Sequence, residues 1–211
     1  MRPVVCFITD RRRFGEAWET ALVERVRAAA TAGVDLIQIR ERDLDGGPLA
    51  RLAVRCVEAV GGTRARVLVN DRLDVALAAG AHGVHLRADS IGASRARAMT
   101  PPGFLIGRSV HTVDEALEED LNKTLDYLIF GTVFETTSKP GRPAAGLVRL
   151  AEVSKTTTIP VLAVGGMSAA RAGDVARTGA AGLAAIGLLS DCPLEGLPNV
   201  VMDVCAAFHT P

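Results

Sequence analysis

Several polar residues of this 211-residue chain directly follow short apolar runs, where they could do chemistry together. Gln38, Arg40 and Arg42 alternate along one such run, so their side chains point to one side of an extended segment. Guanidinium groups on one side suit a polyphosphate, because arginine presents fixed paired donors to its oxygens. The neighbouring Glu41 and Asp43 leave an ion-paired strand end as the alternative.

A second polar group, Asn70 with Asp71, closes the run RVLVN. Asp71 could hold Mg²⁺, which takes oxygen ligands and usually binds only one or two carboxylates beside substrate phosphates. As the N-cap of a helix that starts at Leu73, the same residue would have a structural role. Later runs close with Ser109 and with the histidines His85 and His111, and structural packing is the alternative to substrate contact for each of these.

The longest segment without a helical or strand pattern is TVFETTSKPGRPAAG, which is rich in hydroxyl groups and glycine. Long loops in compact domains are commonly lids or binding loops, although a flexible surface loop is the alternative. Its hydroxyl groups and its lysine form a candidate anion cradle, made of Thr136, Thr137, Ser138 and Lys139.

Glycines close two further runs, at Gly165 and Gly166 and again at Gly187 after Ile186. Glycine lets backbone N–H groups approach an anion, and the loops after the seventh and eighth strands commonly bind phosphate in parallel α/β barrels. The paired placement therefore predicts a phosphate site, with a simple turn as the alternative.

Eight apolar, β-rich runs must position these groups, and stretches with helical periodicity separate them. The runs are continuously apolar rather than alternating, which indicates strands covered on both faces and hence a parallel sheet. Eight β/α units joined by right-handed crossovers close naturally into a barrel, whereas a doubly wound sheet usually has fewer strands. We therefore predict one domain over residues 1–211, an α/β single TIM (β/α)₈ barrel, with its chemistry at the carboxyl ends of the strands. The expected helices include residues 17–32, 48–60, 73–79, 113–120 and 169–178.

Charge and composition limit the classes of binding partner that we expect. Lys plus Arg and Asp plus Glu both number 24, so no overall field attracts nucleic acid or an anionic membrane. The four cysteines lack the CxxC spacing of metal or redox motifs, and we expect reduced thiols. No segment reaches the length of apolar residues that spans a bilayer, which favours a cytoplasmic protein without a membrane partner.

The ordered series FITD, GVDLIQIRERDL, VNDRLDVALAAGAHGVHL, IGRSVHT, DYLIFGTVFETTSKPG and IPVLAVGGM resembles the thiamine-phosphate synthase family, which has a branch of thiazole tautomerases. The resemblance implies a transferase of thiamine biosynthesis. Such an enzyme joins hydroxymethylpyrimidine diphosphate to thiazole phosphate and releases pyrophosphate, with Mg²⁺ as cofactor. Its chemistry is dissociative, so the protein mainly positions the substrates and neutralises charge.

The resemblance also implies roles for the candidate residues. Three would act on the leaving diphosphate as catalytic groups, namely Arg40, Ser109 and Lys139. The implied substrate contacts are Gln38, Arg40 and Arg42 for the pyrimidine diphosphate, Asn70 for the pyrimidine, Thr136, Thr137 and Ser138 for the thiazole phosphate, and Gly166, Ile186 and Gly187 for the backbone phosphate cradle. Asp71 would bind Mg²⁺.

The chain departs from the family pattern at several positions. Arg42 replaces a usual lysine, Arg87 and Ala88 replace a usual Gly-Gln pair, and Ser90 replaces the second Mg²⁺ ligand. Asp89, one residue early, is the candidate substitute ligand. These changes keep two alternatives open: a thiazole tautomerase, and a binding protein for thiazole phosphate without catalysis. The tautomerase branch carries a histidine where this chain has Thr132. The expected partners are the two phosphorylated substrates, with a homodimer as a further candidate.

Overall fold

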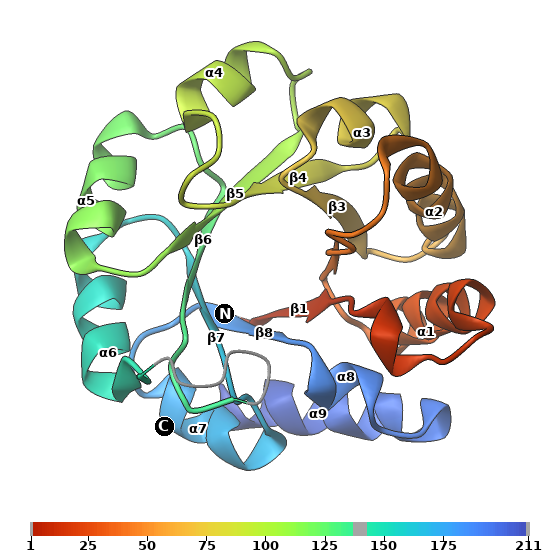
Figure 1. The fold of residues 1–211 in the computed structure, drawn as a ribbon. Helices are drawn as coiled ribbons and strands as arrows, with labels where there is room; N and C mark the ends of the chain where they lie inside the picture. Colours follow the sequence, from red (N-terminus) through yellow and green to blue (C-terminus); the bar gives the residue numbers. More distant parts are fainter. Residues whose placement is uncertain (1, 137–142, 210–211) are drawn as a thin grey trace.

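The computed structural model describes residues 2–136 and 143–209, and these residues form one closed barrel of eight parallel strands in the order β1 to β8. Figure 1 shows the strands enclosing the centre, with the helices in a ring around them. The predicted TIM barrel is confirmed. Its strands are β1 (Val4–Ile8), β2 (Leu36–Ile39), β3 (Arg66–Asn70), β4 (Gly83–Leu86), β5 (Leu105–Val110), β6 (Tyr127–Gly131), β7 (Val161–Val164) and β8 (Gly182–Ala185).

The helices lie between the strands, in the segments whose sequence has helical periodicity. The expected helices agree with the observed ones to within a few residues at each end, except that residues 169–178 contain a short 3₁₀ turn followed by a short helix. The α-helices are α1 (Trp18–Ala32), α2 (Gly46–Ala59), α3 (Leu73–Ala78), α4 (Ala93–Ala98), α5 (Val113–Asn122), α6 (Gly146–Thr156), α7 (Ala172–Ala176), α8 (Gly187–Ser190) and α9 (Leu197–Ala207). The 3₁₀ turns are η1 (Arg11–Arg13), η2 (Ala169–Arg171) and η3 (Leu194–Gly196).

Alternate residues of most strands belong to two separate apolar layers. In β1, Val5 and Phe7 belong to the large layer between strands and helices, whereas Cys6 and Ile8 belong to a small cluster that fills the barrel interior. The interior cluster consists of Cys6, Ile8, Leu36, Leu68, Tyr127, Ile129, Leu162 and Ala184. Polar side chains that follow the strands therefore stand above a closed apolar floor.

The closing seam of the barrel depends on a glycine. Val4 of β1 pairs with Gly182 of β8, and a Cβ atom on Gly182 would lie 1.9 Å from the carbonyl oxygen of Val4. Any side chain here would force the two strands apart.

We expect Gly182→Ala to lower the free energy of unfolding by about 1–3 kcal/mol or more, the usual cost of overpacking a core. Thermal denaturation measures the change. Gly92→Ala is the control, since a Cβ atom there meets nothing within 4 Å. Equal melting temperatures for Gly182→Ala and Gly92→Ala would contradict this account of the seam.

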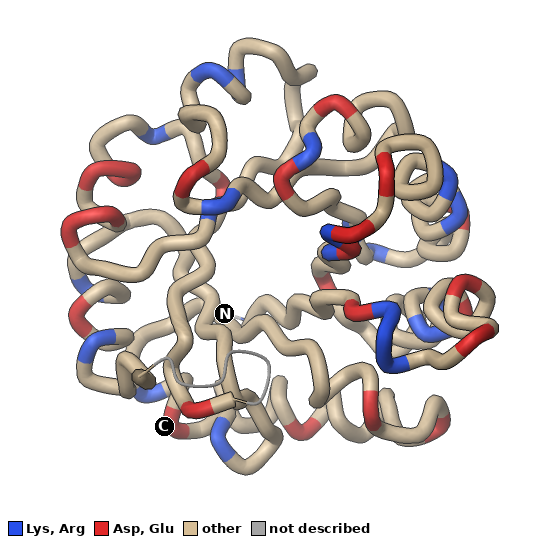
Figure 2. The backbone as a smooth tube through the Cα atoms, in the orientation of Figure 1, with Lys and Arg blue, Asp and Glu red and all other residues tan. Residues whose placement is uncertain are grey.

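Charged residues of both signs are spread around the ring of helices, and arginines gather after β1 and β2 (Figure 2). None of the helices in the described part of the chain combines the length and apolar character that crossing a membrane requires.

Candidate active site

A cavity of about 600 Å³ opens at the carboxyl ends of the strands. It lies where the barrel architecture predicts chemistry. The sequence-predicted site residues that line it are Gln38, Arg40, Arg42, Asn70, Ser109, Thr136, Gly166, Ile186 and Gly187. Thr137, Ser138 and Lys139 lie outside the described residues. Asp71 and Asp89 do not line the cavity but contact Arg87, which does.

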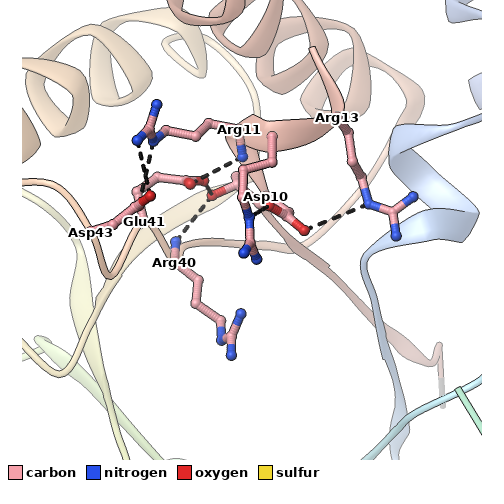
Figure 3. Close-up of polar contacts among 8 residues, drawn as sticks. Asp10, Arg11, Arg13, Arg40, Glu41 and Asp43 are labelled. Atoms are coloured by element: carbon pink, nitrogen blue, oxygen red, sulfur yellow. Dashed lines mark hydrogen bonds and ion pairs between the residues drawn. The ribbon is translucent and has the colours of Figure 1, made fainter. Parts of the chain in front are cut away.

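Arg40 presents an uncompensated positive charge to the cavity. Its side chain extends toward the barrel opening in Figure 3, and burial, followed by repulsion from Arg42, lowers the pKa of its guanidinium. Among the described residues, neither Arg40 nor Arg42 forms an ion pair, unlike most arginines near the opening. A guanidinium that is half-buried and lacks a carboxylate partner is suited to an anionic ligand.

The buried Glu41 fixes the backbone beside Arg40 and forms no ion pair with its guanidinium. Thr9 donates its hydroxyl hydrogen bond to Glu41 Oε1 at 2.5 Å, and the Arg40 N–H donates to Thr9 Oγ1 at 3.0 Å. The N–H of Arg11 donates to Glu41 Oε2 at 3.0 Å (Figure 3). The neighbouring acid Asp43 pairs with Arg11 at 2.9 Å. The acidic neighbours thus tie the end of β1 to β2, and the ion-paired alternative for Arg40 is not observed.

Glu41 should make the stability of the protein depend on pH. Burial raises its pKa above the ordinary 4.5, despite the hydrogen bonds from Thr9 and Arg11 that lower it. A carboxyl group with a raised pKa contributes most stability below its ordinary pKa, and this contribution is lost as the pH rises through the raised value. We expect wild-type stability to fall relative to Glu41→Gln as the pH rises from about 4 toward neutrality.

Denaturant unfolding across this pH range measures the difference. Glu24→Gln, at an exposed position of α1, is the control and should retain the wild-type pH profile. A constant difference in stability between wild type and Glu41→Gln across the range would show that Glu41 does not titrate as described.

Two further arginines, which were not predicted as site residues from the sequence, also line the cavity. Arg12 Nε lies 2.9 Å from Asp10, and Arg13 Nη1 lies 2.6 Å from Asp191, which follows α8. The run RRR after the first strand was their only signal. Both are paired with carboxylates that also line the cavity, so the net positive charge of its β1 and β2 side comes from Arg40 and Arg42.

An amide pair lies deeper in the cavity. Gln38 Nε2 donates to Asn70 Oδ1 at 2.9 Å, and both side chains are buried. The second polar atom of the glutamine, Oε1, is buried and has no hydrogen-bond partner among the described residues. Because an unpaired buried carbonyl is costly, this oxygen is suited to accept a hydrogen bond from a ligand.

The predicted metal ligand Asp71 follows β3 with φ 65°. Its carboxylate accepts a hydrogen bond from the hydroxyl of Ser90 and lies 3.4 Å from Arg87 Nη1. The carboxylate of Asp89 is mostly exposed and pairs with Nη2 of the same guanidinium. Mg²⁺ usually takes only one or two carboxylate ligands from a protein and completes its coordination with water and substrate phosphates. One carboxylate beside one hydroxyl fits this pattern. The described residues contain no cluster of three or more His, Cys, Asp or Glu side chains suited to a metal.

His85 and Ser109 lie on one side of the cavity, and His85 Nε2 is 2.8 Å from Ser109 Oγ. Burial, reinforced by the charges of Arg40 and Arg108, lowers the pKa of His85 to about 3, so the ring is neutral near pH 7. His111 lines a separate cavity of about 310 Å³, and its Nδ1 lies 2.6 Å from the carbonyl oxygen of Gly131. Of the two histidines, only His85 therefore faces the main cavity.

Glycines line the part of the cavity at the ends of β7 and β8. Gly165 and Gly166, after β7, adopt φ values of 104° and 62°, which L side chains rarely take. A Cβ atom on Gly166 would lie 2.5 Å from the carbonyl oxygen of Glu135 and 2.9 Å from Phe134 Cβ. Ile186 and Gly187 follow β8 and line the same part of the cavity. Glycines allow backbone N–H groups to approach an anion, and the phosphate site of the glycine pattern stays a prediction.

Comparison with known proteins gives consistent results over most of the chain. A family model described as thiamine monophosphate synthase matches residues 5–189. The chain is 43% identical over 161 residues to a thiamine-phosphate synthase of Methanoculleus marisnigri, and the matched region covers 76% of each chain. It is 36% identical over 207 residues to that of Roseiflexus castenholzii, covering 97% of this chain and 89% of the relative.

Solved structures are similar too. A thiamine phosphate pyrophosphorylase from Pyrococcus furiosus has a TM-score of 0.82 and 30% identity, covering 98% of this chain and 95% of that one. A 3-hexulose-6-phosphate synthase has a TM-score of 0.71 at 15% identity, covering 98% and 99% of the two chains, which indicates a shared fold alone.

Proposed function

Because the chain belongs to the thiamine monophosphate synthase family, we propose that it joins hydroxymethylpyrimidine diphosphate to thiazole phosphate and releases pyrophosphate. One observation carries the proposal from the geometry. A single cavity is lined by arginines without ion pairs, by the glycines that follow β7 and β8, and by a buried amide pair. Such a cavity can hold two phosphorylated molecules with their uncharged rings facing each other.

The diphosphate belongs on the arginine side in this proposal. Arg40 and Arg42 would bind its oxygens, with Arg12 released from Asp10 to join them. Gln38, whose buried Oε1 has no partner among the described residues, and the adjacent Asn70 would hold the pyrimidine ring by hydrogen bonds. The thiazole phosphate would bind at Gly166, Ile186 and Gly187, with Thr136 nearby. Lys139, Thr137 and Ser138 keep their predicted roles.

The reaction needs positioning and charge, not a protein nucleophile. The carbon–oxygen bond between the pyrimidine methylene and the diphosphate breaks, and its electron pair leaves with the diphosphate. The thiazole nitrogen then donates its electron pair to the methylene carbon. Fixed guanidinium groups stabilise the charge that develops on the diphosphate, and the two binding sites hold the reacting atoms close.

Mg²⁺ is part of the proposal, with Asp71 as its protein ligand and the Ser90 hydroxyl beside it. A bound Mg²⁺ would supply Lewis-acid charge to the diphosphate oxygens. Both carboxylates contact Arg87, and Asp89 is the weaker candidate because its side chain is mostly exposed, whereas that of Asp71 is partly buried.

The two alternatives are not favoured. The relatives named above are thiamine-phosphate synthases, and a buried threonine, Thr132, lines the cavity where the tautomerase branch has its histidine. A hydroxyl of ordinary acidity is a poor general acid or base. The substrates are small phosphorylated molecules, whereas the homodimer and the cytoplasmic location stay predictions.

The test supplies purified protein with the pyrimidine diphosphate, the aromatic thiazole phosphate and Mg²⁺, and measures thiamine phosphate by chromatography. A parallel sample receives only the non-aromatic thiazole tautomer. We expect product in the first sample and no conversion in the second. Conversion of the tautomer without thiamine phosphate would favour the isomerase, and binding without turnover in either sample would favour a binding protein.

A further inference from the structure

Three side chains form a continuous polar path from the barrel interior to the cavity. Tyr127 of β6 and His85 of β4 are buried, with 5% and 1% of their surfaces exposed. The Tyr127 hydroxyl lies 3.1 Å from His85 Nδ1, and His85 Nε2 lies 2.8 Å from Ser109 Oγ. Ser109, on β5, lines the cavity. The path therefore ends at the cavity in which the diphosphate is proposed to bind.

The Tyr127 hydroxyl determines which nitrogen of His85 carries the hydrogen. A buried hydroxyl group needs an acceptor for its hydrogen, because a buried donor without a hydrogen bond costs free energy. Within residues 2–136 and 143–209, the recorded hydrogen-bond contact of this hydroxyl is with His85 Nδ1. Tyr127 therefore donates, and Nδ1 accepts. Burial raises the pKa of Tyr127 well above 10, which keeps this donor protonated.

A neutral imidazole carries one N–H, so its hydrogen must be on Nε2 when Nδ1 accepts. The burial of His85 and the nearby charges of Arg40 and Arg108 hold the ring neutral. The Nε2–H then donates to Ser109 Oγ, and the hydroxyl hydrogen of Ser109 is left free to point elsewhere. The open direction is the cavity that Ser109 lines.

We propose that Tyr127 and His85 are positioning residues that make Ser109 a hydrogen-bond donor to an anionic oxygen of the bound diphosphate. This rests on the proposed function for the identity of the anion. Without the tyrosine, the serine hydroxyl could instead donate to the histidine and present only lone pairs to the substrate. A donor with its direction fixed in advance avoids that competition and needs no reorganisation when negative charge develops.

The barrel makes specific room for this path. A Cβ atom on Gly107 would lie 2.0 Å from Tyr127 Cζ, so a glycine on β5 is what allows the ring to reach His85. The rings of His85 and Tyr127 are stacked with centroids 5.7 Å apart, which limits their movement. The path is thus determined by strand packing and does not depend on a flexible loop.

The test combines a spectroscopic measurement with kinetics on Tyr127→Phe and Ser109→Ala. Nitrogen NMR of protein with ¹⁵N-labelled histidine should show the Nε2–H tautomer of His85 in the wild type. Tyr127→Phe should show the Nδ1–H tautomer as well. Each single variant should lower kcat/KM by about tenfold, the scale of one hydrogen bond to a charged group. The double variant should be no slower than Ser109→Ala, because both changes remove the same donor.

Three comparisons separate this role from a structural one. Leu68→Val removes one methylene from the same interior cluster, and it should leave the tautomer and kcat/KM unchanged. His85→Gln, which retains an N–H donor, should be more active than His85→Leu. Titration with inorganic pyrophosphate should show about tenfold weaker binding to Ser109→Ala than to the wild type, whether or not thiamine phosphate forms.

The Nδ1–H tautomer in the wild type would overturn the proposal, as would a Tyr127→Phe variant in which either the tautomer or kcat/KM matches the wild type. The tautomer and the pyrophosphate titration do not depend on turnover. If they agree with the proposal while no thiamine phosphate forms, the path stands and the proposed function fails.

Discussion

Replacing Arg40 with methionine is expected to lower kcat/KM for thiamine phosphate formation by about a hundredfold to a thousandfold, as loss of a fixed oxyanion donor does. Methionine retains much of the apolar stem but removes the charge. The guanidinium is half-buried, and no carboxylate among the described residues forms an ion pair with it. The backbone of Arg40 is held by the hydrogen bond to Thr9 Oγ1, so a neighbouring arginine cannot easily replace it.

Steady-state kinetics with the pyrimidine diphosphate as the varied substrate measures the loss. Arg40→Lys should recover only part of the activity, because lysine keeps the charge but not the paired donors. The control is Arg66→Met, an exposed arginine at the opposite end of the barrel, where β3 begins. A fall of less than tenfold for Arg40→Met would remove this residue from the diphosphate site.

Replacing Gly166 with alanine should impair the use of thiazole phosphate selectively. An alanine at φ 62° costs about 1–2 kcal/mol in backbone strain, and overpacking costs about 1–3 kcal/mol more. The new Cβ atom would meet the carbonyl oxygen of Glu135 at 2.5 Å, so the backbone there must shift. We expect kcat/KM for thiazole phosphate to fall by about a hundredfold, with a smaller change in the KM of the diphosphate.

The control for this variant is Gly62→Ala. Gly62 also has a positive φ, 77°, but a Cβ atom there meets nothing within 4 Å, and the residue lies on the connection between α2 and β3. Its alanine variant should lose stability without losing activity. Equal loss of activity toward both substrates in Gly166→Ala would indicate general damage to the barrel, contrary to the proposed phosphate site.

Much of the fold could be predicted from the sequence because parallel barrel strands are buried on both faces. Such strands have a continuous apolar pattern, and β1 to β8 coincide with the apolar runs. The barrel geometry then places the polar residue after each run at one rim. That is why Gln38, Ser109 and Gly166, which are distant in sequence, could be predicted to share a site and do line one cavity.

Long-range pairing explains what sequence reasoning missed. Arg13 pairs with Asp191, 178 residues away, and no local pattern predicts that contact. Tyr127 lies inside an apolar run, where its ring looks like core packing and its hydroxyl contact with His85 is invisible. Local reasoning also suggested Glu41 as an ionic partner for the strand-end arginines, whereas its carboxylate binds Thr9 and the backbone of Arg11.

The central claim is that this barrel joins two phosphorylated substrates and releases pyrophosphate. The most direct measurement is a phosphorus NMR time course on wild-type protein with pyrimidine diphosphate, thiazole phosphate and Mg²⁺ in one sample. The account predicts that the signals of both substrates decline together, while thiamine phosphate and pyrophosphate appear in equal amounts. Pyrophosphate without thiamine phosphate, or no change in any signal, would contradict the account.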